Sequence, residues 1–133
     1  MFTLLSTLPA FIAYFAMAVI LTALFLLIYT KITPYDEFAL IKAGQLTPAL
    51  SLSGSLLGFV IALAAVIKNS VSIADMAIWG LVALVVQLLA FVMTRLLFKD
   101  LTQGIQNNNV AKGTFLGILS LSFGILNAAC MTY

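Results

Sequence analysis

The sequence contains no histidine, one cysteine and few charged residues, and each scarcity argues against a class of protein. Without histidine, the chain lacks the base of Ser-His and Cys-His nucleophile systems and the commonest metal ligand. A single cysteine, Cys130, cannot form an internal disulfide. Charged residues make up 8% of the chain, against about 25% in an average soluble protein. The composition therefore disfavours a soluble fold and a histidine-dependent enzyme.

Recognisable catalytic and phosphate-binding motifs are also missing. The sequence has no glycine-rich phosphate loop, CxxC or HExxH, so we predict a protein that is not an enzyme, with no catalytic residue, cofactor or metal site. Asp36 and Glu37 are adjacent carboxylates, but without His or Cys nearby they are a weak metal signal. The formal net charge of +2 is too small and too scattered for a nucleic-acid surface.

Four apolar blocks fill the sequence, in which 64% of residues are hydrophobic. They run from about 8–29, 48–67, 73–97 and 111–131, and each is long enough to cross a hydrocarbon core of about 30 Å. We therefore predict an all-α polytopic protein with four transmembrane helices in a lipid bilayer. The short connections leave no room for a separate soluble domain.

Local signals mark two of the predicted helix starts. Thr47 followed by Pro48 is typical of an N-cap and a first helical position. Ser72 with Asp75 three residues later resembles a capping box.

The connections after the first and third helices are predicted to be amphipathic. Residues 34–43 should form a short interfacial helix that ends at Gly44, with its charged side chains toward water. The second connection ends in the polar run GIQNNN at 104–109. We expect the charged residues of both connections to offer a docking surface to a soluble partner: Asp36, Glu37, Lys42, Lys99 and Asp100.

The distribution of basic residues predicts the orientation. Those in or beside the connections after the first and third helices are Lys31, Lys42, Arg95, Lys99 and Lys112. The connection between the second and third helices holds Lys68 alone. Because basic loops stay in the cytoplasm, we predict that both termini and the loop at 68–75 lie outside, in the periplasm of a Gram-negative cell.

An internal similarity indicates a duplication. A shift of about 64 residues superposes the first helix on the third and the second on the fourth. The matched pairs are Thr30 with Thr94, Lys31 with Arg95, Asp36 with Asp100, Ile41 with Ile105, Leu52 with Leu116 and Phe59 with Phe123. We predict two tandem helical hairpins, 1–70 and 71–133, that form a parallel repeat. The register in the second and fourth helices stays open, since their small residues match better at about 66.

A seam of small residues runs along the second predicted helix. Ser51, Gly54, Ser55 and Gly58 fall on one face, because residues three and four apart are neighbours. The fourth helix carries a comparable seam, formed by Gly113, Gly117, Ser120 and Gly124. One interpretation is close packing between helices, with the serines bonded to backbone carbonyls. The other is that Ser51 and Ser55 line a polar pathway through a homo-oligomer.

Two amide side chains and a tyrosine lie within or beside the predicted spans. Gln87 should face protein or water, since an unpaired amide in hydrocarbon costs several kcal/mol. Asn127 lies near the end of the fourth helix. We interpret both side chains as forming hydrogen bonds between helices. The alternative is that they line a pore. Tyr29 is expected at the membrane interface, where aromatic side chains are common.

The segments KITP, NSVSI and NAACMT, within a full-length similarity, resemble the YjfL-like bacterial inner-membrane proteins. The resemblance implies an inner-membrane protein with two tandem copies of a domain of unknown function. It also implies partners, because such genes often lie near those for an ATP-grasp enzyme and a phage-shock-type membrane-remodelling protein. It transfers no catalytic or binding residue.

Two functions follow from these features. The first is a membrane scaffold or docking protein in envelope maintenance, which recruits a soluble cytoplasmic partner. The second is a small oligomeric channel or transporter for ions or small polar solutes. The lack of buried charges favours the scaffold, because ion and proton routes usually contain them.

Overall fold

The described part of the chain contains four long helices, a short helix and three further helical residues at 103–105. The computed structural model describes residues 2–33, 36–97, 103–105 and 107–131. Its helices are α1 (Phe2–Ile32), α2 (Glu37–Lys42), α3 (Leu46–Asn69), α4 (Ile73–Leu97) and α6 (Val110–Cys130). The four long helices are long and apolar enough to cross a membrane. The predicted all-α membrane fold is confirmed, with bounds close to the predicted ones except that α1 begins at Phe2.

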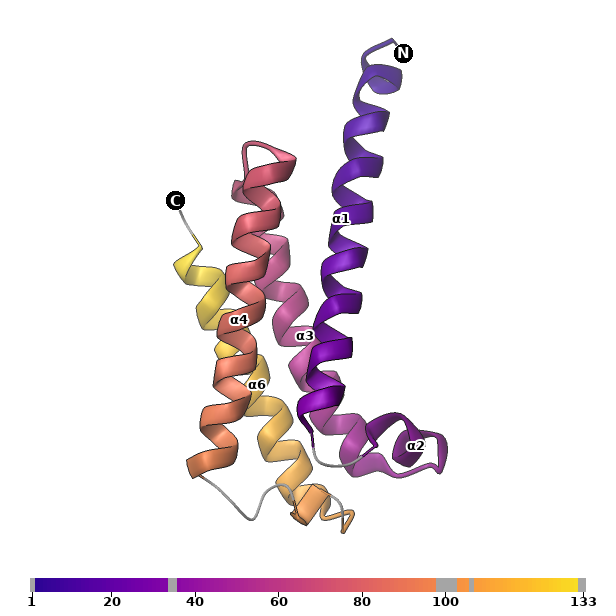
Figure 1. Cartoon of the computed structure of the whole chain (residues 1–133), viewed down its shortest axis with the longest axis vertical. Coiled ribbons are helices and arrows are strands. Elements are labelled where there is room, and N and C mark those ends of the chain that lie inside the picture. Colours follow the sequence, from indigo (N-terminus) through magenta and orange to yellow (C-terminus); the bar gives the residue numbers. More distant parts are fainter. Residues whose placement is uncertain (1, 34–35, 98–102, 106, 132–133) are drawn as a thin grey trace.

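The helices alternate in direction. The start of α1, the α3–α4 turn and the end of α6 lie at one end of the bundle, whereas α2, the end of α4 and the start of α6 lie at the other (Figure 1). Four alternating spans bring both termini to the same side of a membrane. The arrangement fits two successive hairpins, α1 with α3 and α4 with α6; the duplication itself stays a prediction.

The centre of the bundle is a close contact between α3 and α6, which cross against one another (Figure 1). Gly54 of α3 lies on the backbone of Gly117, and Gly124 of α6 lies on the backbone of Gly58, so an added methyl group would overlap the facing backbone. Helices in lipid gain stability from such close backbone packing, because lipid tails are as apolar as leucine. The two small-residue seams therefore meet each other.

α1 packs through its C-terminal half, where it contacts α3 and α4. Phe25 stacks on Phe59 of α3 with ring centroids 4.7 Å apart, and Tyr29 lies 4.8 Å from the ring of Phe91 in α4. The N-terminal end of α1 extends beyond the other helices (Figure 1), and Phe11 and Phe15, farther along this helix, are more than half exposed.

Of the two helix starts predicted from capping signals, the one at Ser72 is confirmed and the one at Thr47 is not. Ser72 Oγ accepts a hydrogen bond from the Asp75 N–H at 3.1 Å, as in a capping box, while Asp75 Oδ2 accepts from the Val71 N–H at 3.1 Å and not from that of Ser72. Asp36 Oδ1 accepts from the Ala39 N–H at 3.2 Å and so caps α2. The prediction for Thr47 is wrong, because α3 begins at Leu46 and Thr47 lies inside its first turn. Its N–H donates instead to Asn108 Oδ1 at 3.3 Å, so a side chain from the other connection replaces the local cap.

The short helix α2 covers fewer residues than the predicted 34–43. It ends where predicted, because Gly44 takes a left-handed conformation with φ of 86°, which a glycine adopts without the steric cost of a side chain.

Candidate functional site

A set of buried polar side chains lies inside the bundle and includes members from each of the four long helices. Each is at most 7% exposed. They are Tyr29 of α1, Ser51 and Ser55 of α3, Gln87 of α4, and Ser120 and Asn127 of α6. We call these six residues the polar core. Five of them were predicted from the sequence as helix-packing or pore-lining residues, whereas Tyr29 was expected at the membrane interface.

The hydroxyl of Tyr29 lies between the two serines of α3. Ser55 Oγ donates to Tyr29 Oη at 3.3 Å, and Tyr29 Oη and Ser51 Oγ are 3.5 Å apart. Tyr29 is fully buried in the bundle and does not face lipid; its depth at the membrane interface stays a prediction. One tyrosine near a helix end matches the pattern of an interfacial belt, and only the packing on Phe25 and Phe91 brings it inside. The sequence led us to expect hydrogen bonds from the serine hydroxyls to backbone carbonyls, and it did not indicate the Tyr29 hydroxyl as their partner.

Gln87 ties α4 to both central helices. Its Nε2 donates to the Ser120 carbonyl oxygen at 2.8 Å and lies 3.5 Å from the carbonyl oxygen of Ser55. Gly58 makes room for this amide, because a methyl group there would lie 2.8 Å from Nε2. Asn127 forms a second link, from its Nδ2 to the Ala83 carbonyl oxygen at 3.3 Å. Both amides thus form bonds between helices.

Some buried oxygen atoms have no protein partner. Within the described part of the chain, Gln87 Oε1 and Thr47 Oγ1 are buried and accept no hydrogen bond. A buried acceptor without a donor costs about 1–3 kcal/mol. Thr47, Ser51 and Ser55 follow one another at intervals of four residues, so the unpaired Thr47 hydroxyl continues the row of serines toward α2.

The charged residues around α2 do not all face water. Asp36 and Lys42 are exposed, as expected, but Glu37 is 1% exposed. The water-facing prediction for Glu37 is therefore wrong. Glu37 begins α2, which packs on α3. Lys99 and Asp100 lie outside the described residues.

The described residues offer no assembled metal site. No group of three His, Cys, Asp or Glu side chains converges among them. Asp36 and Glu37 differ in environment, since one is exposed and the other buried.

Comparisons with known proteins agree with this architecture. A family model described as Domain of Unknown Function (DUF350) matches residues 3–131. The chain is 48% identical over 130 residues to the UPF0719 inner membrane protein YjfL of Escherichia coli (strain K12), covering 98% of both chains. It is 29% identical over 120 residues to the UPF0719 transmembrane protein YshE of Bacillus subtilis (strain 168), covering 88% of this chain and 89% of that one. No solved structure matches significantly.

Proposed function

The chain belongs to the DUF350 family, as its resemblance to YjfL-like inner-membrane proteins predicted, and on that premise we propose that it is a membrane scaffold or docking component. In this role the bundle is a static anchor, and the surface around α2 recruits a soluble partner. The partner proposed from the family resemblance is a phage-shock-type or ATP-grasp protein that acts in envelope maintenance. The proposal includes no catalytic step.

The closed packing of the polar core supports an anchor. Ser51, Ser55 and Ser120 are at most 4% exposed, and the glycine contacts bring α3 and α6 together at the backbone. Hydroxyls enclosed by their own bundle stabilise the association of the helices in lipid. This enclosure is the observation that carries the proposal. It gives the polar core a role in helix packing and leaves the exposed surface around α2 as the part that can recruit a partner.

The helix α2 supplies an ordered surface with both apolar and charged side chains for a partner. It is capped by Asp36, ends at Gly44 and buries Glu37 against the bundle. Phe38 is 47% exposed and Lys42 is also exposed. A surface that is ordered before binding spares the partner much of the entropy cost of association. By the distribution of basic residues, this surface faces the cytoplasm.

Site-specific photocrosslinking tests the scaffold. A photoreactive benzoyl-phenylalanine placed at Phe38 in intact cells should capture one soluble cytoplasmic protein, identified by mass spectrometry. The matched control is the same residue at Phe115 of α6, which is 48% exposed and belongs to a membrane span. Capture at Phe115 alone, or no protein adduct at Phe38 in native membranes, would contradict the proposal.

A small oligomeric channel or transporter is the second candidate. The unpaired oxygens Gln87 Oε1 and Thr47 Oγ1 favour it, because buried polar groups within a membrane often mark a pathway for water or ions. A single closed bundle would have to open, or several copies would have to assemble, for a solute to pass. Flux of common ions and polyamines into proteoliposomes, abolished by Ser55→Leu, would support a channel, whereas an inert bilayer would exclude it.

A further inference from the structure

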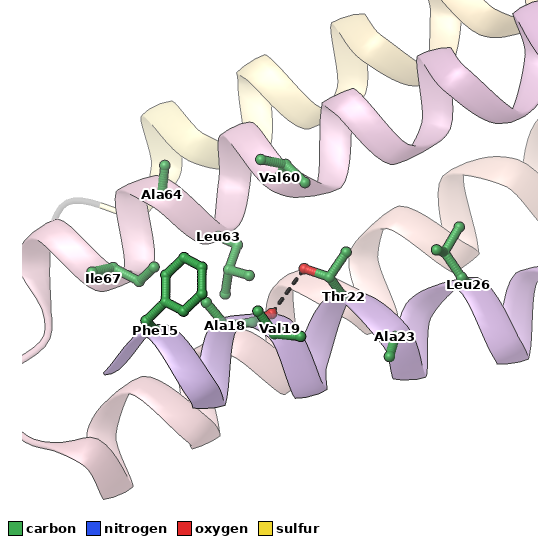
Figure 2. Close-up of a pocket in the computed structure, with 10 residues that line it drawn as sticks. All are labelled: Phe15, Ala18, Val19, Thr22, Ala23, Leu26, Val60, Leu63, Ala64 and Ile67. Carbon is green, nitrogen blue, oxygen red and sulfur yellow. Dashed lines mark hydrogen bonds between the residues drawn. The ribbon is translucent and has the colours of Figure 1, made fainter. Parts of the chain in front are cut away.

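A groove of about 440 Å³ lies between α1 and α3 in the half of the bundle toward the α3–α4 turn. In Figure 2, Phe15 and Ile67 lie near one end and Leu26 near the other, with Ala18 and Thr22 between them. Small side chains on α1 and the exposed Ala64 of α3 leave the hollow. Its floor is closed, because Leu63 is 3% exposed and packs with Leu21 over Gly80 of α4.

The lining of the groove favours a hydrocarbon ligand. All ten lining residues are apolar except Thr22, and Thr22 Oγ1 already donates to the Ala18 carbonyl oxygen at 2.8 Å (Figure 2). A polar ligand would lose its bonds to water there without replacement.

The dimensions of the groove distinguish a lipid chain from a helix. Phe15 and Leu26 are eleven residues apart, or about 16 Å along α1, which matches half of a hydrocarbon core of about 30 Å. A volume of 440 Å³ over that length gives a cross-section of about 27 Å². An α-helix of the same length, about 10 Å wide, would fill about 1,200 Å³. The groove therefore has room for one extended hydrocarbon chain along its length, whereas a helix from a second copy could only lie over its open side.

A lysine follows the last groove-lining residue of α3 in the sequence. Lys68 follows Ile67 directly, is exposed and lies in the last turn of α3. A lysine at the end of a span extends its ammonium group into the headgroup region, where lipid phosphates lie. We propose that the groove binds one acyl chain of a phospholipid from the leaflet at the α3–α4 turn, with the phosphate of that lipid paired to Lys68.

Photoaffinity labelling tests the site. The full chain is reconstituted in nanodiscs that contain phosphatidylglycerol with a diazirine midway along one acyl chain, and the adducts are mapped by mass spectrometry. Adducts should concentrate on the groove residues of α1 and α3. Ala64→Phe fills the groove and should reduce these adducts about tenfold, the equivalent of about 1.4 kcal/mol. Ala16→Phe, an exposed position on α1 outside the groove lining, should leave them unchanged.

A second pair of variants tests the headgroup contact independently of the groove shape. Lys68→Gln should lower the adduct yield about threefold, as expected for loss of one partly exposed charge pair, whereas Lys42→Gln at the opposite end should not. Adducts spread evenly over all lipid-facing helices would overturn the proposal, because they would indicate ordinary surrounding lipid.

Discussion

Gln87 Nε2 lies 2.8 Å from the carbonyl oxygen of Ser120, which fixes the middle of α4 to the α3–α6 pair. The same amide leaves its oxygen unpaired and buried. The hydrogen bond from Gln87 Nε2 therefore stabilises the fold, whereas its buried, unpaired oxygen destabilises it.

We predict that Gln87→Leu is well tolerated and that Gln87→Glu is not. Leucine removes the bond but also the unpaired oxygen, so the free energy of unfolding should change by less than about 1 kcal/mol. An ionised glutamate in the same place should cost about 3 kcal/mol. Thermal unfolding of the purified protein in detergent measures both. A larger loss in the free energy of unfolding for Gln87→Leu than for Gln87→Glu would contradict the prediction. It would show that the hydrogen bond of the amide outweighs the cost of its unpaired oxygen.

The α3–α6 contact should be sensitive to a single methyl group. Gly54→Ala places that group on the backbone of Gly117, so the helices must separate, at a cost of about 1–3 kcal/mol. The matched control is Gly104→Ala, where the added group meets the flexible side chain of Lys112 and should cost much less. Equal unfolding midpoints for the two variants would be inconsistent with a backbone contact at Gly54.

The Tyr29 hydroxyl should be coupled energetically to Ser55. Tyr29→Phe keeps the ring contacts and removes the bond from Ser55 Oγ, so we expect a loss of about 1 kcal/mol. Ser55→Ala should add little to the double variant, which gives a coupling of about 0.5–1 kcal/mol in a double-mutant cycle. Tyr14→Phe on the same helix is the control, and it should show no coupling to Ser55→Ala.

The single native cysteine reports the orientation. Cys130 is exposed at the end of α6, on the same side as the α3–α4 turn (Figure 1). If basic loops are cytoplasmic, a membrane-impermeant maleimide should label Cys130 in intact spheroplasts. A Cys130→Ser, Lys42→Cys variant should be labelled only after permeabilisation. The reverse pattern would place both termini in the cytoplasm.

The small-residue face could be located in the sequence because its cause is local. A seam of glycine and serine at helical spacing is visible in one segment, but the sequence left open whether it packs on another helix or lines a polar pathway. The sequence did not indicate that the seam of α3 meets the seam of α6, because partner choice depends on contacts between residues more than sixty positions apart.

The positions of Tyr29, Glu37 and Thr47 depend on tertiary contacts. A tyrosine in a lipid-facing belt, a water-facing glutamate and a threonine N-cap are each the common outcome for their local pattern. Instead, Phe91 and the serines of α3 enclose Tyr29, Glu37 is buried where α2 meets the bundle, and the Thr47 N–H donates to Asn108.

The sequence alone determined that this chain is a membrane protein with four spans, because the length and hydropathy of a segment decide whether it can replace water with lipid. Only the tertiary structure decided which polar side chains meet in the middle and where α1 parts from α3 to leave a groove. Those features depend on the angles and distances between packed helices, and a pattern within one helix does not specify them.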